Sequence, residues 1–440
     1  MLINFSIQNF GSIKDKQTLS FEAANSKHLE DYYVIETNGL RLLKLGLIYG
    51  ANASGKTTIL KAFQFLINIV LKPQEQKTKS LNFEPFLFDI NTPRQNTIFT
   101  IDFLQNNVRY VYEIELNKKF ITKEILSYSK KTTDTKKIIK IFERTTDSEK
   151  QLSNIVFPEK TIDDVFLKTL ISNTLWNNTV LSGFLKTNIE LKALTDVTNW
   201  FKEYLNPVIY TRTELDEFIT KRIDNCEINK TIVLQILKNA DFNLSDIIIK
   251  EEKEAIPKGF LDFLEKGKKI EEDKLQELRE SGKITNGSLE FEHTIGNNKY
   301  SLPFIQESQG TIRYYGFAGL LYLSIKKSTL FLIDELESSL HPDLFQHFLL
   351  SFLVNSHSSQ LLATTHNREI LNNKDIFRND AILIADKENI ECATELYSLA
   401  DFDTSVIRDT SNIYNAYKIG KLGGTPNLRS YYIDIENENE

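Results

Sequence analysis

Cysteine is scarce in this 440-residue sequence, which contains only Cys226 and Cys392. Two cysteines so far apart make neither a disulfide framework nor a zinc site, and they favour a reducing cytosol. No apolar run approaches the ~20 residues that a membrane-spanning helix needs. The first residues also lack the basic stretch and apolar core of a signal peptide. We therefore expect a cytoplasmic protein with no membrane contact.

Positive charge is in short supply as well, since 53 Lys and Arg residues face 60 Asp and Glu residues, for a net charge of -7. A protein that coats nucleic acid is usually basic overall, so any contact with DNA would need a local patch. One segment has a run of such lysines: Lys118, Lys119, Lys123, Lys130, Lys131, Lys136, Lys137 and Lys140. The plain interpretation of the run is a solvated hairpin, and the alternative is a surface that docks DNA or protein.

The pattern of apolar residues predicts an α/β fold with an interrupted core. Residues 45–49 form a short apolar run that ends at Gly50, and a long apolar helix is expected from Thr57. Two further apolar runs, at 330–333 and 361–364, are typical of strands buried in a parallel sheet. Between these parts, stretches such as 97–103 alternate apolar and polar residues, which predicts an antiparallel β-lobe.

We expect three segments along the chain. Residues 1–155 would hold the first part of the core and the β-lobe, residues 156–285 a helical insertion, and residues 286–440 the rest of the core. Within the insertion, residues 250–280 are rich in Glu and Lys, which suits an exposed amphipathic arm or a short helical hairpin.

The segment Gly50-Ala51-Asn52-Ala53-Ser54-Gly55-Lys56-Thr57 matches the phosphate-loop pattern G-x-x-x-x-G-K-[ST]. Glycines let the backbone fold around phosphate oxygens, and the following helix directs its positive end at them. We expect Lys56 to reach the β- and γ-phosphates of ATP and Thr57 to hold Mg²⁺. The neighbouring Thr58 belongs to the same candidate site. An ordinary glycine-rich turn is the alternative, but the strand before the loop and the helix after it argue against that.

A second candidate element is Asp334-Glu335, which directly follows the apolar run 330–333. Ligands bind at the carboxyl ends of parallel strands, so Asp334 is expected to contact Mg²⁺ and Glu335 to polarise the attacking water. Two acids at this position also suit a simple helix N-terminus. The phosphate loop upstream favours the catalytic interpretation.

Two more elements are candidates for contact with the γ-phosphate. Ser308 and Gly310 precede an apolar helix, where Ser308 is either an ordinary N-cap or part of an anion site that addresses a nucleotide held by a second subunit. His366 follows the predicted strand 361–364, and there it is either a structural residue or a γ-phosphate sensor.

In their order along the chain, these motifs resemble those of ABC-type ATPases of the SMC, RecF and OLD kind, and most of all the RloA/AbiL-like and AriA-like ATPases of bacterial anti-phage systems. The resemblance makes Gly50–Thr57 a Walker A motif, Ser308–Gly310 a divergent signature, Leu330–Glu335 a Walker B motif, Ser338–His341 a D-loop and Thr365–His366 an H-loop. The usual Leu-Ser-Gly-Gly-Gln signature is absent. Three residues are candidates for the Q-loop glutamine: Gln74, Gln76 and Gln95.

The resemblance implies an ATPase that assembles as a nucleotide-sandwich dimer or larger oligomer and controls a co-encoded effector, such as a nuclease, in phage defence. The alternative is an ATPase that acts directly on DNA in repair. An OLD-type nuclease would need a carboxylate cluster after the core, and the chain beyond Asp386 is too short for that domain. A transporter subunit would not carry the inserted lobe and arm.

Overall fold

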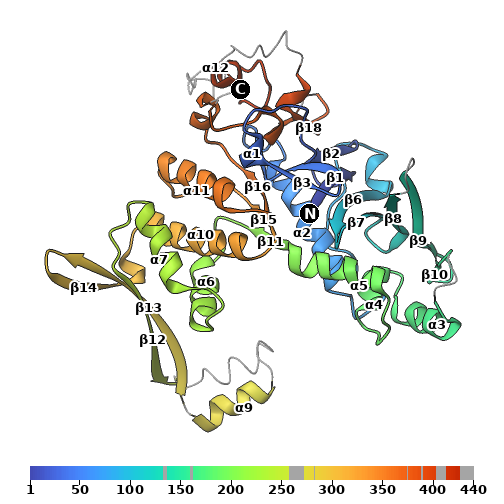
Figure 1. Ribbon diagram of the computed structural model, residues 1–440. Coiled ribbons are helices and arrows are strands. Elements are labelled where there is room, and N and C mark those ends of the chain that lie inside the picture. The colour runs from blue at the N-terminus through green and yellow to red at the C-terminus, as the bar shows by residue number, and fades with distance from the viewer. Residues whose placement is uncertain are drawn as a thin grey trace, which may run out of the picture. The chain divides into compact units, whose positions relative to one another are not determined.

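The computed structural model describes residues 1–131, 136–158, 162–256, 272–281, 283–373, 375–387, 390–402 and 413–426 (Figure 1). The chain forms two compact units. The first comprises Met1–Thr213, Ser324–Ser338 and Leu349–Glu440, and the second comprises Glu214–Leu323 and Ser339–Phe348. These bounds differ from those of the three expected segments, because a strand from the middle of the chain belongs to the core sheet of the first unit.

The core of the first unit is a six-stranded sheet in the order β11-β15-β16-β5-β17-β18. Its strands are β5 (Leu45–Tyr49), β11 (Leu205–Ile209), β15 (Leu330–Ile333), β16 (Gln360–Thr364), β17 (Ile382–Lys387) and β18 (Thr394–Ser398). All neighbours are parallel except β17 and β18. Every residue of β5, β15 and β16 is buried, as expected for central strands covered on both faces.

The predicted antiparallel lobe is confirmed as a seven-stranded sheet in the order β10-β9-β8-β7-β6-β1-β2. Its strands are β1 (Leu2–Gln8), β2 (Gln17–Ser20), β6 (Thr97–Gln105), β7 (Val108–Leu116), β8 (Ile121–Lys131), β9 (Lys136–Asp147) and β10 (Leu152–Val156). The turn between β6 and β7 consists of Asn106 and Asn107, both with positive φ, which is the conformation that tight hairpins favour.

Gln360, at the start of β16, joins the two sheets through one fully buried side chain. Its Oε1 accepts hydrogen bonds from the backbone N–H of Leu2 (2.7 Å) and the hydroxyl of Tyr204 (2.8 Å). Its Nε2 donates to the carbonyls of Leu2 and Leu43, each at 3.0 Å. The amide oxygen thus accepts two hydrogen bonds and the amide nitrogen donates two, which offsets the cost of burying this polar side chain.

The segment 156–285 was expected to be helical, and it contains strands as well as helices. Its helical elements are α3 (Asp164–Asn173), α4 (Val180–Phe184), α5 (Lys192–Asn199), the π-turn η2 (Trp200–Tyr204), α6 (Leu215–Asp224), α7 (Lys230–Asn239) and α9 (Glu272–Ser281). Strand β11 enters the core sheet, and β12 (Asp246–Ala255) begins the expected amphipathic arm. Three consecutive isoleucines, at 247–249, favour this strand through their β-branched side chains.

In the second unit, β12 forms a three-stranded antiparallel sheet with β13 (Lys283–Ile295) and β14 (Asn298–Pro303). Of the expected arm at 250–280, the structure describes the end of β12 and most of α9, and residues 257–271 lie outside the described part. Figure 1 shows β12, β13 and β14 in olive.

The remaining elements are short apart from three helices. The helices are α2 (Lys56–Leu71), α10 (Gln309–Lys326) and α11 (Pro342–Asn355). The short elements are α1 (Glu30–Tyr33), β3 (Val34–Thr37), β4 (Leu40–Leu43), η1 (Thr92–Arg94), η3 (Phe304–Gln306), η4 (Glu369–Asn372), η5 (Asn379–Ala381), η6 (Leu399–Asp401) and α12 (Ile413–Lys418). In the described part of the chain, no helix is both long and apolar enough to cross a membrane.

Candidate nucleotide-binding site

The loop between β5 and α2 has the backbone of an anion-binding nest. Gly55 adopts φ +104° and Ala53 φ +63°, so the chain turns sharply before α2 begins at Lys56. No side chain caps this end of the helix. Among the described residues, the backbone N–H groups of Gly55, Lys56 and Thr57 have no hydrogen-bond acceptor. Unpaired N–H groups at a helix N-terminus favour binding of a phosphate.

Both loop glycines are required by close packing. A Cβ on Gly50 would lie 2.3 Å from the carbonyl oxygen of Ala385 in β17. A Cβ on Gly55 would lie 2.1 Å from Thr394 Oγ1 in β18. The same Thr394 hydroxyl lies 2.8 Å from the carbonyl oxygen of Ser54 and 2.7 Å from Ser12 Oγ. Thr394 therefore fixes the loop from a strand more than 330 residues downstream, a role that the sequence analysis missed.

The side chain of Lys56 lies across the loop. Its Nζ donates to the carbonyls of Gly50 and Ala51, each at 2.9 Å. Burial lowers the pKa of Lys56 to about 8, and the nearby carboxylates of Asp334, Glu335 and Glu337 oppose that shift. The ammonium group is therefore mostly protonated at neutral pH, and it is held where a phosphate inside the loop would meet it.

Asp334 lies at the carboxyl end of β15, where two hydroxyl groups meet it. Both of its carboxylate oxygens lie 3.1 Å from Thr57 Oγ1. The hydroxyl of Thr364, at the end of the neighbouring strand β16, donates to Asp334 Oδ1 at 2.7 Å. A carboxylate and a threonine hydroxyl are hard oxygen ligands of the kind that Mg²⁺ takes together with water and phosphate oxygens. Asp334 and Thr57 thus fit the predicted Mg²⁺ site.

Thr364 also holds the second acid, because its Oγ1 accepts the backbone N–H of Glu335 at 2.8 Å. Glu335 has φ +48°, and its side chain is exposed. The charge of Glu335 acts on Lys56, so its carboxylate lies near the loop. This role of Thr364 could not be predicted from the sequence, since a threonine near the end of a strand has no distinctive pattern.

His366 lies just beyond β16, at the same edge of the sheet. Burial is the main cause that lowers the pKa of its imidazole, and the positive charge of Lys56 acts in the same direction. The backbone N–H of His366 donates to Glu337 Oε1 at 2.5 Å. The structure therefore brings Lys56, Asp334, Glu335 and His366 to one edge of the core, together with Glu337.

At this edge, β11 contributes Tyr210, which follows its last residue. Burial raises the pKa of Tyr210, and the charge of Asp334 raises it further. None of the three candidate Q-loop glutamines follows a strand of this sheet. Gln95 comes after η1, and Gln74 and Gln76 lie in the loop after α2.

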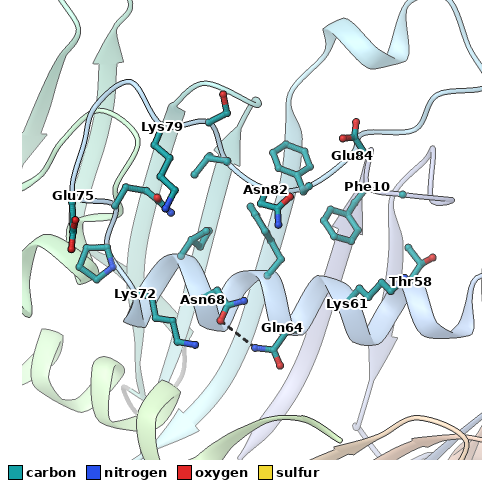
Figure 2. A pocket seen from close by; sticks show the side chains of 18 of the residues that line it. Phe10, Thr58, Lys61, Gln64, Asn68, Lys72, Glu75, Lys79, Asn82 and Glu84 are labelled. Carbon is teal, nitrogen blue, oxygen red and sulfur yellow. Dashed lines mark hydrogen bonds between the residues drawn. The ribbon is translucent and has the colours of Figure 1, made fainter. Parts of the chain in front are cut away.

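That loop and α2 border a groove of about 1070 Å³, which begins at Thr58 beside the phosphate loop. Figure 2 shows side chains of α2 along one wall, and further polar side chains from the facing loop. The labelled residues of the helix are Thr58, Lys61, Gln64 and Asn68, Lys72 directly follows the helix, and the labelled residues of the loop are Glu75, Lys79, Asn82 and Glu84.

Ser308 and Gly310 lie in the second unit, as do residues 339–341 of the predicted D-loop, whereas the phosphate loop, Asp334, Glu335 and His366 lie in the first. Ser308 Oγ accepts the backbone N–H of Thr311 at 3.0 Å, as an N-cap does. Just before it, Glu307 Oε1 lies 2.8 Å from His293 Nε2, which ties the start of α10 to β13. The N-cap contact is present, and contact with the nucleotide of another subunit stays a prediction.

The core strand β5 leads through a glycine-rich loop into a helix that carries Lys56 and Thr57. Together with Asp334, which directly follows β15, these elements define a P-loop ATPase fold. Residues 47–372 match the model of the family described as "AAA domain, putative AbiEii toxin, Type IV TA system". The chain belongs to this family. No curated relative matches it.

Two solved structures of SMC heads are similar to this chain. One is the SmcHead bound to the C-winged helix domain of ScpA, with 12% sequence identity, 90% of this chain and 97% of that chain covered, and a TM-score of 0.45. The other is the SMC head domain from Thermotoga maritima, with 12% identity, 90% and 98% covered, and a TM-score of 0.38.

The packing of Gly55 gives a first prediction. Gly55→Ala should abolish ATP binding, measured by isothermal titration, because its Cβ would overlap Thr394 Oγ1 and force the loop to move. Gly296→Ala is the matched control, since Gly296 also has positive φ (+61°) but open space around its Cβ position. ATP affinity in Gly55→Ala equal to that of Gly296→Ala would refute the tight-packing argument.

Proposed function

We propose that this protein binds Mg-ATP at the loop 50–57 and hydrolyses it. The observation that carries the proposal is the meeting of Thr57 with Asp334, at 3.1 Å, beside the buried ammonium group of Lys56. A cation and a metal-binding pair at the end of an anion-binding helix together match the charges of a nucleotide triphosphate with its Mg²⁺.

In this function, Lys56 leaves the loop carbonyls to bind phosphate oxygens, while the free N–H groups at the start of α2 bind others. Thr57 and Asp334 would hold Mg²⁺, which would supply positive charge at the phosphates. Glu335 orients the attacking water, and His366, with its lowered pKa, donates a hydrogen bond from its neutral ring to the γ-phosphate. These residues position the reactants and stabilise charge, which is how most phosphoryl-transfer enzymes achieve catalysis.

We also propose that two copies sandwich the nucleotide, with Ser308 and Gly310 of one copy contacting the ATP bound to the other. Support comes from the helix N-terminus at α10, whose N–H groups suit an anion. Such a dimer would have one isologous interface on a twofold axis, with two equivalent nucleotide sites.

The bound state, in turn, would control a partner protein. The family description names a toxin and a toxin–antitoxin system, which favours a co-encoded effector, for example a nuclease, that acts in anti-phage defence. ATP can shift such an assembly only by binding one of its states more tightly than the other. A γ-phosphate shared between two subunits would supply that difference.

Direct action on DNA is the second candidate function, and the lysine run gives it little support. Lys118 pairs with Glu84 at 2.5 Å and Lys140 with Glu143 at 2.6 Å, while Lys123 lies 3.9 Å from Glu113. Neighbouring acids thus partly cancel the charge that a DNA phosphate would meet. The side chains of Lys130, Lys131, Lys136 and Lys137 lie outside the described part of the structure.

Hydrolysis is tested with two substitutions. Lys56→Ala should abolish ATP binding, because the phosphates lose their main side-chain cation. Glu335→Gln should keep binding but lower kcat by about 100-fold or more, because the carboxylate no longer polarises water. ATP titration and phosphate release measure the two effects. Unchanged turnover in Glu335→Gln would rule out its catalytic role, and no hydrolysis by the wild-type protein, with Mg²⁺ and a supplied partner, would rule out the proposal.

Assembly is tested by mixing two inactive variants. If Ser308 acts across an interface, equal amounts of Lys56→Ala and Ser308→Arg subunits should recover up to about a quarter of the wild-type rate. Half of the dimers are then mixed, and each mixed dimer has one intact site of two. Each variant mixed with itself is the control. No recovery, or a wild-type rate per subunit that does not fall on dilution, would contradict the sandwich.

Partner control is tested by phage plating and growth of cells. The ATPase expressed alone should be neither toxic nor protective, and protection should require the neighbouring gene together with intact Lys56. The Lys56→Ala protein with its neighbour is the matched control. Protection by the ATPase alone, or by the Lys56→Ala pair, would refute control of an effector through ATP.

A further inference from the structure

Glu337 is an acidic residue at the candidate site that has no role in the mechanism above. It follows Glu335 by two positions, in the loop after β15. Its Oε1 accepts the backbone N–H of His366 at 2.5 Å. Its Oε2 is buried and has no hydrogen-bond partner among the described residues.

The contact with His366 lies where the backbone pairing of the sheet stops. Thr365 N–H still donates to the carbonyl of Ile48 in β5, at 3.0 Å. The next N–H, that of His366, donates to the Glu337 carboxylate instead of to another backbone carbonyl. A hydrogen bond to a carboxylate is shorter and about twice as strong as a neutral one. It therefore fixes the first residue beyond the sheet, whose imidazole is a candidate γ-phosphate contact.

The Glu337 carboxylate acts on both Lys56 and His366, whose pKa values its negative charge raises. It also adds to the negative charge of Asp334 and Glu335 within four residues, which costs electrostatic repulsion. Glu337 therefore belongs to the charged groups of the site as well as to the edge of the sheet, and the oxygen that accepts the His366 N–H is the part of it that fixes the backbone.

We infer that Glu337 is a positioning residue for ATP hydrolysis, one that holds the backbone of His366 so that the imidazole meets the γ-phosphate. The inference rests on the proposed function. Glu337 itself touches neither the nucleotide nor the attacking water. Its effect on the rate passes through His366, and this dependence separates it from a residue that only stabilises the fold.

The test compares Glu337→Ala, Glu337→Gln and Glu337→Asp in the full-length protein, with kcat and KM for ATP measured for each. Glu337→Gln keeps an oxygen in the same place and should stay within about threefold of wild type. Glu337→Ala removes the acceptor and Glu337→Asp is one methylene too short, so both should lower kcat by about 10- to 100-fold, the cost of a misplacement near 1 Å. KM should change little. Glu391→Ala, which removes an exposed acid paired with Lys14, is the control.

A double-mutant cycle with His366→Ala identifies the route of the effect. If Glu337 acts through the imidazole, Glu337→Ala should not lower kcat further in the His366→Ala protein. If the two substitutions lower kcat independently, so that their effects multiply in the double variant, the inference is wrong. It is also wrong if Glu337→Gln is as impaired as Glu337→Ala, or if Glu337→Ala is as active as wild type. If Glu337→Ala does not fold, Glu337→Gln and Glu337→Asp give the same comparison. Absence of wild-type hydrolysis would instead refute the proposed function.

Discussion

The buried carboxylate of Asp334 is the group around which this site is arranged. Only 8% of the residue is exposed, and burying a carboxylate is costly unless hydrogen bonds replace its water. Thr57 and Thr364 supply those contacts, and they come from the ends of two other segments of the core. The sheet can meet this requirement because β5, β15 and β16 run in parallel and end at the same edge.

The strands on the other side of β5 limit the space that is available to the phosphate loop. Gly50 packs on the backbone of β17 and Gly55 on Thr394 of β18, so the loop is confined by two strands that come last in the core. A loop confined in this way keeps its N–H groups oriented before any ligand arrives, so less conformational entropy is lost on binding. The preference for glycine thus comes from the neighbouring strands as much as from the phosphates.

The sequence predicted the parts of the fold that have strong local patterns. The apolar runs at 330–333 and 361–364 coincide with β15 and most of β16, and the alternating stretches became the antiparallel sheet. The strand β12 was missed because the acids and lysines that follow Ile249 suggest a helical arm.

Contacts between side chains that are far apart in the sequence also could not be predicted. Thr364, Thr394 and Glu337 contact the candidate site only because of the order of the strands, and a lone threonine or glutamate has no pattern of its own. The motif at 50–57 was found because its contacts are built from consecutive residues. Gln360 is a similar case to the threonines, since its four bonds reach residues at 2, 43 and 204, which no local window contains.

The strand order has a consequence for how the chain is made on the ribosome. Among the described strands, β5, which is fully buried and apolar, pairs with β16 and β17 alone, and both begin more than 310 residues after it. At 5–20 residues per second, the nascent chain carries β5 without either partner for about 15–60 s. The hairpins β6–β10 need only local contacts and can form in that interval. An unpaired apolar strand exposed for so long is a natural target for chaperones, and the P-loop is completed only when synthesis reaches Thr394.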